Sequence, residues 1–192
     1  MTRRLTGTII AVAGGAVILV LLAAVLREAN RHSGLPLDDT AIIRRQAADK
    51  HLDPALIAAV IYAESKFEPR PSSAGAQGLM QILPATAYFL AHLSGGRTFT
   101  AADLARPEVN VAYGSYYLRY LLDHYGGDET LALAAYNGGI SNVDRWVADA
   151  RRTGSRLTVE SIPFPETREY VQRVLVAQQA YRATYPRALG LE

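Results

Sequence analysis

The chain has 192 residues, of which 49% are apolar and 20% are charged, so it can form one globular domain and a short additional segment. Its formal net charge is +2, and acidic and basic residues are interleaved along most of the chain, which argues against a nucleic-acid-binding protein. It has no cysteine, which excludes disulfides, thiolate metal sites and a cysteine nucleophile. The four histidines have no metal-ligand spacing, so we expect no metal site.

The first predicted element is an apolar segment at the N-terminus. Residues 5–26 contain no charged side chain and are rich in Ile, Val, Leu and Ala. A helix needs about 20 such residues to cross the hydrocarbon core of a membrane. The alternative is a cleaved signal peptide, but its apolar region usually spans only about 7–15 residues. The sequence therefore predicts one transmembrane anchor over residues 1–28, followed by a tether over residues 29–39.

The rest of the chain shows helical patterns separated by turns, without strand-like alternation of useful length. Proline and capping residues mark the helix starts, and pairs of glycine mark several helix ends. The predicted helices cover residues 38–50, 53–65, 84–93, 107–125, 128–136, 141–150 and 165–185, with a short turn at 100–104. These elements predict an all-α domain over residues 40–186 and a C-terminal tail over residues 187–192.

One acidic residue stands on the apolar face of the predicted helix 53–65. Glu64 follows Ile57, Val60 and Ile61 by seven, four and three residues, so it continues their stripe. A glutamate is seldom buried unless it is paired. Desolvation and the negative end of the helix dipole would both raise its pKa, which suits a proton donor near neutral pH. Periodicity alone leaves open that Glu64 is simply exposed at a frayed helix end.

Four motifs accompany this glutamate. They read AESKFEP at residues 63–69, GAQGLMQ at 75–81, AYNGG at 135–139 and IPFPETREYV at 162–171. In this order they resemble the catalytic domain of soluble-type lytic transglycosylases, a family related to goose-type lysozyme. The resemblance covers about residues 41–185. It implies a predominantly helical, lysozyme-like domain with a substrate cleft.

The resemblance also implies an activity. Such an enzyme cleaves the β-1,4 bond between N-acetylmuramic acid and N-acetylglucosamine in peptidoglycan. Glu64 would be the single catalytic residue. It would protonate the glycosidic oxygen and then act as base on the muramyl 6-hydroxyl, which closes on C1 and leaves a 1,6-anhydro sugar. No cofactor and no second carboxylate are needed, and Glu68 is expected to point to solvent.

The same resemblance implies a set of substrate-binding residues. They are Ser73, Met80, Gln81, Tyr136, Asn137, Glu166 and Tyr170. Met80 would form an apolar wall, and Gln81 would donate and accept hydrogen bonds with the sugar. Tyr136 would point its hydroxyl toward the scissile bond or Glu64. Glu166 would contact the substrate or orient the cleft beside Tyr170, although a helix-capping role for Glu166 is also open.

A row of tyrosines follows at helical spacing. Tyr113, Tyr116, Tyr117 and Tyr120 lie in the predicted helix 107–125, and we expect most of them in the core. Tyr116 or Tyr117 is the candidate for a position in the glycan groove, and the sequence does not distinguish between the two.

The main alternative is a muramidase, a hydrolase on the same fold that uses water. A non-enzymatic wall-binding module is a third reading, and the intact Glu64 argues against it. Peptidoglycan lies outside the plasma membrane, so the catalytic domain is expected on the extracytoplasmic side, as part of a single-pass membrane protein. The expected partners are glycan strands and the plasma membrane, and not nucleic acid. An association with cell-wall or secretion machinery is left open.

Overall fold

The computed structural model describes residues 35–95 and 98–192, and within these residues 38–192 form one compact unit. Its helices are α2 (Thr40–Lys50), α3 (Pro54–Ser65), α4 (Pro84–Leu93), α5 (Pro107–His124), α6 (Glu129–Gly138), α7 (Ile140–Arg152), α8 (Pro165–Thr184) and α9 (Pro186–Leu189). Two short 3₁₀ helices, η1 (Ala101–Ala105) and η2 (Val159–Ser161), complete the set. The predicted all-α class is therefore confirmed for the described residues.

Each helix predicted between residues 38 and 185 is present, with ends that differ by a few residues at most. The difference lies at the C-terminus, where α9 packs against α2 and α8 and buries Leu189. The packed unit thus extends beyond residue 186, into the segment predicted as a tail. The predicted anchor, residues 1–28, lies outside the described residues. Among those that are described, no helix is both long and apolar enough to cross a membrane.

Helix α3 is the centre of the fold. Every residue from Ala55 to Ile61 is at most 1% exposed, so the helix is buried on all sides and not along a single stripe. Its start is held by Asp53, whose Oδ1 accepts the amide of Ala55 at 3.0 Å. The other oxygen accepts hydrogen bonds from Gln178 at 2.7 Å and Arg182 at 3.1 Å, both on α8. These bonds join α3 to α8, its main packing partner.

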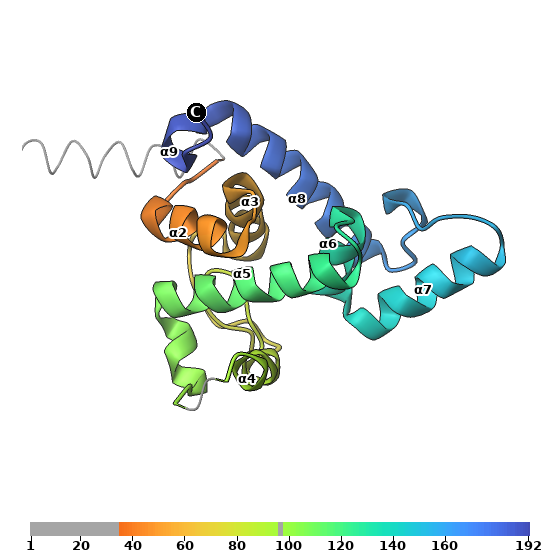
Figure 1. The fold of residues 1–192 in the computed structure, drawn as a ribbon, viewed down its shortest axis with the longest axis horizontal. Helices are drawn as coiled ribbons and strands as arrows, with labels where there is room; N and C mark the ends of the chain where they lie inside the picture. The colour runs from red at the N-terminus through yellow and green to blue at the C-terminus, as the bar shows by residue number, and fades with distance from the viewer. Residues whose placement is uncertain (1–34, 96–97) are drawn as a thin grey trace, which may run out of the picture. The chain divides into compact units, whose positions relative to one another are not determined.

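Helix α5 runs across the middle of the unit, with α2, α3 and α8 on one side and α4 on the other (Figure 1). It packs on α2 and α6, and it also carries α4 and η1. Helix α6 then contacts both α7 and α8. As a result, the C-terminal ends of α3 and α6 and the loop between α3 and α4 are brought together by α5 and α8.

Candidate active site

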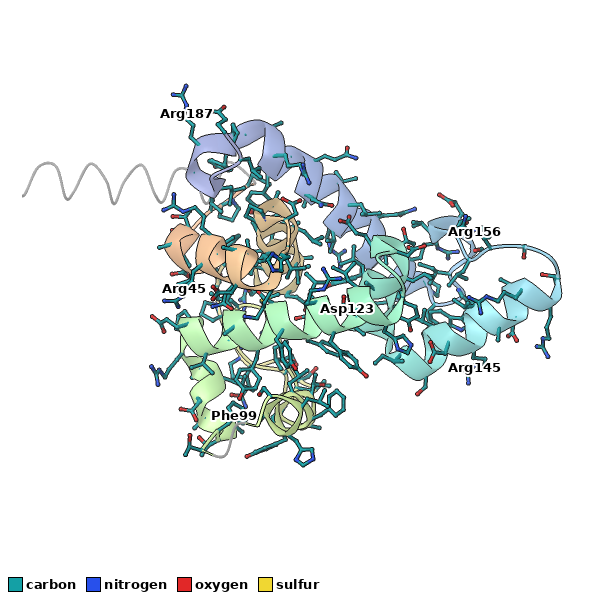
Figure 2. The ribbon with its side chains drawn as sticks, in the orientation of Figure 1. Arg45, Phe99, Asp123, Arg145, Arg156 and Arg187 are labelled. Atoms are coloured by element: carbon teal, nitrogen blue, oxygen red, sulfur yellow. The ribbon has the colours of Figure 1, made fainter. Side chains whose placement is uncertain are left out.

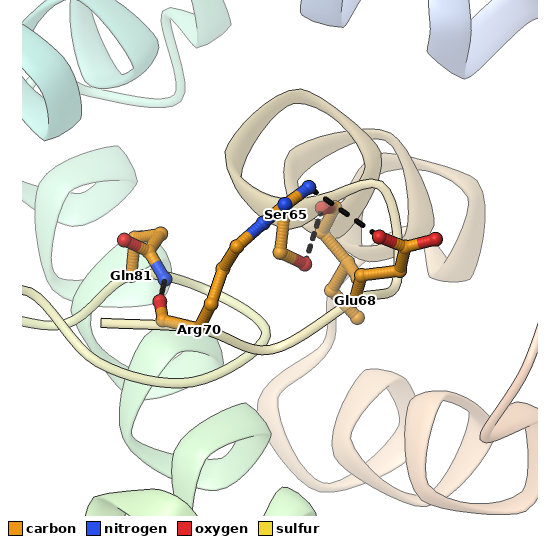
Figure 3. A network of polar contacts seen from close by, with 5 residues as sticks. Ser65, Glu68, Arg70 and Gln81 are labelled. Atoms are coloured by element: carbon orange, nitrogen blue, oxygen red, sulfur yellow. Dashed lines mark hydrogen bonds and ion pairs between the residues drawn. The ribbon is translucent and has the colours of Figure 1, made fainter. Parts of the chain in front are cut away.

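Glu64 lies in the last turn of α3, immediately before a sharp change of chain direction. Lys66 and Phe67 both adopt left-handed backbone conformations, with φ of 53° and 63°, which L-residues seldom do. The turn is fixed by Phe67, which is 4% exposed, and by a hydrogen bond of 3.1 Å from the Ser65 hydroxyl to the Ile61 carbonyl (Figure 3). The helix end that carries Glu64 is therefore well defined.

The loop after α3 folds into a tight hairpin closed by an antiparallel bridge between Gln77 and Ile82. Gly78 lies inside it with φ of 76°, and a Cβ there would stand 2.1 Å from the Asn110 amide nitrogen. Asn110, on α5, accepts the Met80 amide at 2.8 Å. It also donates to the carbonyls of Gln77 at 2.7 Å and Leu104 at 3.1 Å. One buried asparagine thus fixes the shape of the loop.

Met80 is fully buried and its side chain packs directly against Gly114 of α5, where a Cβ would be 2.4 Å from the sulfur. The predicted role of Met80 as an apolar wall toward the substrate does not fit a side chain without exposed surface. Its backbone carbonyl has a partner instead, because the Tyr136 hydroxyl donates to it at 2.9 Å. Met80 therefore positions Tyr136 at the end of α6.

Two tyrosines from different helices lie beside the Glu64 carboxyl. The charge of Glu64 helps to raise the pKa of both Tyr136 and Tyr170, after the larger effect of their burial. The Tyr136 hydroxyl donates its proton to the Met80 carbonyl and so does not offer it to Glu64. Its predicted orientation toward the scissile bond stays a prediction. The Tyr170 hydroxyl is buried and, among the described residues, has no other hydrogen-bond partner; its interaction with the Glu64 carboxyl lowers the pKa of Glu64. Tyr170 is the tyrosine available to Glu64.

The Glu64 carboxyl is partly buried, and this raises its pKa to about 7. Desolvation is the main cause, and it is opposed first by the Tyr170 hydroxyl and then by the Arg173 guanidinium. In the described part of the chain, no acidic side chain contributes to the shift. Glu64 can thus hold its proton near neutral pH and release it with little cost, as a general acid and base requires.

The raised pKa of Glu64 predicts how the free energy of unfolding depends on pH. A glutamate in an unfolded chain has a pKa of ~4.3, whereas the pKa of Glu64 in the folded protein is about 7, so the folded state favours the protonated form. The contribution of Glu64 to the free energy of unfolding is therefore full below the unfolded pKa and is lost as pH rises through about 7. Each unit between the two pKa values is worth ~1.4 kcal/mol. Between pH 4 and pH 8 the wild type should lose about 3 kcal/mol of unfolding free energy relative to Glu64→Gln. Urea unfolding at several pH values measures this. A difference that does not change with pH would contradict the buried placement of Glu64.

The other predicted binding residues occupy different positions around this centre. Ser73 is exposed at a turn of the loop, whereas its neighbour Ser72 accepts the amide of Ala76 at 3.0 Å and shapes that turn. Gln81 uses both amide protons within the loop. It donates to the carbonyl of Arg70 at 2.8 Å (Figure 3) and to the carbonyl of Gly78 at 2.8 Å. Only its carbonyl oxygen is left to accept a hydrogen bond from a ligand, so the donor role predicted for Gln81 is not available.

Asn137 and Glu166 lie at the junction of α6 and α8. The Asn137 side chain is exposed, and its oxygen accepts the Thr167 hydroxyl at 2.8 Å. Thr167 also packs against Gly138, where a Cβ would approach its hydroxyl to 3.0 Å. Glu166 is exposed in the first turn of α8, one turn before Tyr170. The structure therefore places Glu166 at the surface and Tyr170 beside Glu64.

Glu68 is exposed, as predicted, and forms a 3.4 Å ion pair with Arg70 on the surface of the loop (Figure 3). It contributes nothing to the pKa of Glu64. The nearest glutamate in the sequence is therefore not a second acid for the site.

Sequence reasoning missed Asn110, Gly114 and Arg173. Asn110 and Gly114 interrupt a buried stripe of α5 that continues with Leu118 and Leu121. A buried asparagine on an apolar stripe is the same signal that singled out Glu64, so this residue could have been found. Arg173 gave no such signal, because an arginine on an exposed helix position is ordinary.

Two family models match the chain. The first is described as "Transglycosylase SLT domain" and covers residues 41–159, and the second as "Soluble lytic transglycosylase helical domain" and covers residues 161–191. Among curated relatives, the soluble lytic murein transglycosylase of Escherichia coli is 35% identical over 150 residues, which are 77% of this chain and 23% of that protein. A membrane-bound lytic murein transglycosylase C of Photorhabdus laumondii is 30% identical over 173 residues, 78% of this chain and 47% of that protein.

The fold also matches a solved structure. A crystal structure of an inactive glutamate-to-glutamine mutant of the lytic transglycosylase Slt from Pseudomonas aeruginosa superposes with a TM-score of 0.70 at 34% identity. The match covers 78% of this chain and 24% of that one. The chain thus spans about a quarter of the length of the Escherichia coli and Pseudomonas relatives.

Proposed function

Because the chain belongs to the transglycosylase SLT domain family, we propose that it is a peptidoglycan lytic transglycosylase with Glu64 as its single catalytic residue. The proposed reaction breaks the β-1,4 bond between N-acetylmuramic acid and N-acetylglucosamine and leaves a 1,6-anhydromuramic acid end. The observation that carries the proposal is the state of Glu64. It is an isolated, partly buried acid whose pKa is raised to about 7 and which no neighbouring carboxylate influences within the described residues.

The proposed reaction consists of two proton transfers, and both use Glu64. Protonated Glu64 gives its proton to the glycosidic oxygen as the bond to C1 breaks. The carboxylate then takes the proton of the muramyl 6-hydroxyl as that oxygen bonds to C1, so no water is consumed and Glu64 is restored. The Tyr170 hydroxyl, which lacks another partner, supports the carboxylate between the two proton transfers. The raised pKa allows one group to serve as both acid and base.

Among the residues that the structure describes, no second carboxylate influences Glu64, and this favours the proposed reaction over hydrolysis. A retaining hydrolase places its nucleophilic carboxylate about 5–5.5 Å from the acid, and an inverting one places its base at about 6.5–9.5 Å. At such separations in a partly buried site, a second carboxylate would raise the pKa of the first. Desolvation, and not a neighbouring acid, accounts for the raised pKa of Glu64.

Mass analysis of the muropeptides released from purified sacculi tests the proposal. Anhydro products are lighter than hydrolysed ones by one water, and we expect the anhydro products alone. Reducing ends from the wild-type enzyme would instead establish the muramidase.

The variant Glu166→Gln extends this test to the remaining candidate for a second carboxylate. Glu166 is exposed at the start of α8, so we expect weaker binding and reduced activity, with 1,6-anhydro sugars still formed. Glu169→Gln, another exposed glutamate of the same helix, serves as the control. Loss of activity to the level of Glu64→Gln, together with reducing-end products from the wild type, would assign a two-carboxylate mechanism.

The location follows from the substrate. Peptidoglycan lies outside the plasma membrane, so we place this domain on the extracytoplasmic side, with residues 5–26 as a single-pass anchor. The uncharged, apolar sequence of that segment and the existence of a membrane-bound relative support this placement. Ser73, Gln81, Asn137 and Glu166 remain the proposed substrate contacts around Glu64.

A further inference from the structure

Four aromatic side chains from three helices form a continuous row that begins beside Glu64. Tyr136, on α6, lies 5.3 Å from Tyr117, on α5, between ring centroids. Tyr117 is followed by Tyr120 at 6.4 Å, with the two rings within 14° of parallel. Phe89, on α4, then meets Tyr120 edge-on at 5.6 Å. The row thus leads from the catalytic acid across α5 to α4.

The row is partly exposed along its length. Tyr136, Tyr117 and Tyr120 are each partly exposed, and Phe89 at the outer end is 43% exposed. Exposed apolar surface that continues from a functional site marks a candidate ligand-binding groove.

The outer end of the row is also held in place. Helix α4 packs on α5 and η1. Beside Phe89, the Tyr88 ring meets Phe99 at 5.4 Å, and Phe99 packs on Tyr113 of α5 at 4.6 Å. Figure 2 shows Phe99 in the part of the unit that contains α4. Two aromatic contacts therefore attach α4 to α5, so that Phe89 is a fixed ring open to solvent.

A fixed, exposed aromatic ring is suited to binding a pyranose. The C–H groups on one face of the sugar carry partial positive charge and stack against the electron-rich face of the ring. A glycan strand repeats such faces along its length. We propose that Phe89, supported by Tyr120, forms a distal subsite that binds a sugar of the same strand several units from the bond cleaved at Glu64. The inference rests on the proposed function, because it takes the strand as the ligand.

This subsite makes the enzyme sensitive to strand length. On this proposal an octasaccharide occupies both the Glu64 centre and Phe89, whereas a tetrasaccharide placed for cleavage at Glu64 does not extend to Phe89. Truncation of Phe89 should therefore weaken binding of the octasaccharide, mainly by raising its KM. An apolar patch that served a second copy of the chain or a membrane would give no such dependence on substrate length.

The experiment compares Phe89→Ala with Leu93→Ala on peptidoglycan tetrasaccharides and octasaccharides. Leu93 is the matched control, since it lies on the same helix and is 47% exposed but is not part of the row. In Phe89→Ala we expect the ratio of kcat/KM for the octasaccharide over the tetrasaccharide to fall about five- to tenfold. Phe89→Trp should restore it, and Leu93→Ala should keep the wild-type ratio.

Several results would overturn the inference. They are an unchanged ratio in Phe89→Ala, an equal loss on both substrates, and the same loss in Leu93→Ala. Calorimetric binding of the two oligosaccharides to Glu64→Gln, with and without Phe89→Ala, gives a readout that needs no turnover. Wild-type protein that binds the octasaccharide through Phe89 but releases no anhydro product would refute the proposed reaction and leave the subsite intact. Normal cleavage without a role for Phe89 would refute the subsite alone.

Discussion

Glu64→Gln is expected to lower turnover by at least about 10²–10⁴-fold, the usual contribution of general acid–base catalysis. Glutamine keeps the size and much of the hydrogen-bonding capacity of the carboxyl but cannot deliver a proton. Because the native site holds a desolvated carboxyl whose pKa is about 7, the neutral amide suits the same surroundings. The variant should therefore fold normally while it loses activity.

The measurement is the rate of anhydromuropeptide release from sacculi, with circular dichroism and thermal unfolding to check the fold. Glu68→Gln is the matched control, because it changes an exposed glutamate four residues away that pairs with Arg70. It should retain near wild-type activity. If a folded Glu64→Gln protein kept half of the wild-type rate, Glu64 would not be the catalytic acid.

The helices were predictable because local signals mark them strongly. Asp53 caps α3 and Pro54 occupies its first position, and prolines also begin α4, α5 and α8. Such capping and backbone effects act within a few residues, so the sequence alone displays them. Helix α9 also begins with a proline, Pro186, but it is a single turn whose place depends on burial of Leu189 against distant helices.

The site was predictable where a polar or charged residue lies within an apolar segment. Glu64 drew attention as an acid within an apolar helix, and the structure gives it the raised pKa that this position implies. The roles of Tyr136 and Tyr170 could not be separated in the same way, since each role depends on which way a hydroxyl points. The Tyr136 hydroxyl is bound by a carbonyl 56 residues away, which leaves Tyr170 for Glu64.

The position of Met80 could not be predicted from the sequence. An apolar residue in a loop can line a ligand site or fill the core, and its sequence context is the same in both cases. The decisive feature is Gly114, which lies in another helix and leaves space for the Met80 side chain. Contacts of this kind depend on tertiary packing, and no local pattern records them.

Asn110→Ala is expected to lower the free energy of unfolding by about 2–6 kcal/mol. The side chain is fully buried and makes three hydrogen bonds, of 2.8, 2.7 and 3.1 Å, to the backbone of the hairpin loop and η1. Its removal leaves the Met80 amide and the Leu104 carbonyl without these partners, at about 1–3 kcal/mol for each buried group. The Gln77 carbonyl still accepts the Ile82 amide at 3.0 Å. A loss of this size approaches the whole stability of a small domain.

Asn110 also links stability to the site, because the loop it holds presents the Met80 carbonyl that binds Tyr136. Asn110→Asp separates its two roles, since it can still accept the Met80 amide but cannot donate to the carbonyls of Gln77 and Leu104. It should be destabilised as well. Asn142→Ala is the control: it removes one amide that donates to the Gly138 carbonyl at 2.7 Å from a partly exposed helix position. Urea unfolding should show a loss of about 1 kcal/mol for that variant. An Asn110→Ala protein as stable as Asn142→Ala would show that the loop is held by its own turn, and the link from α5 through Met80 to Tyr136 would have to be abandoned.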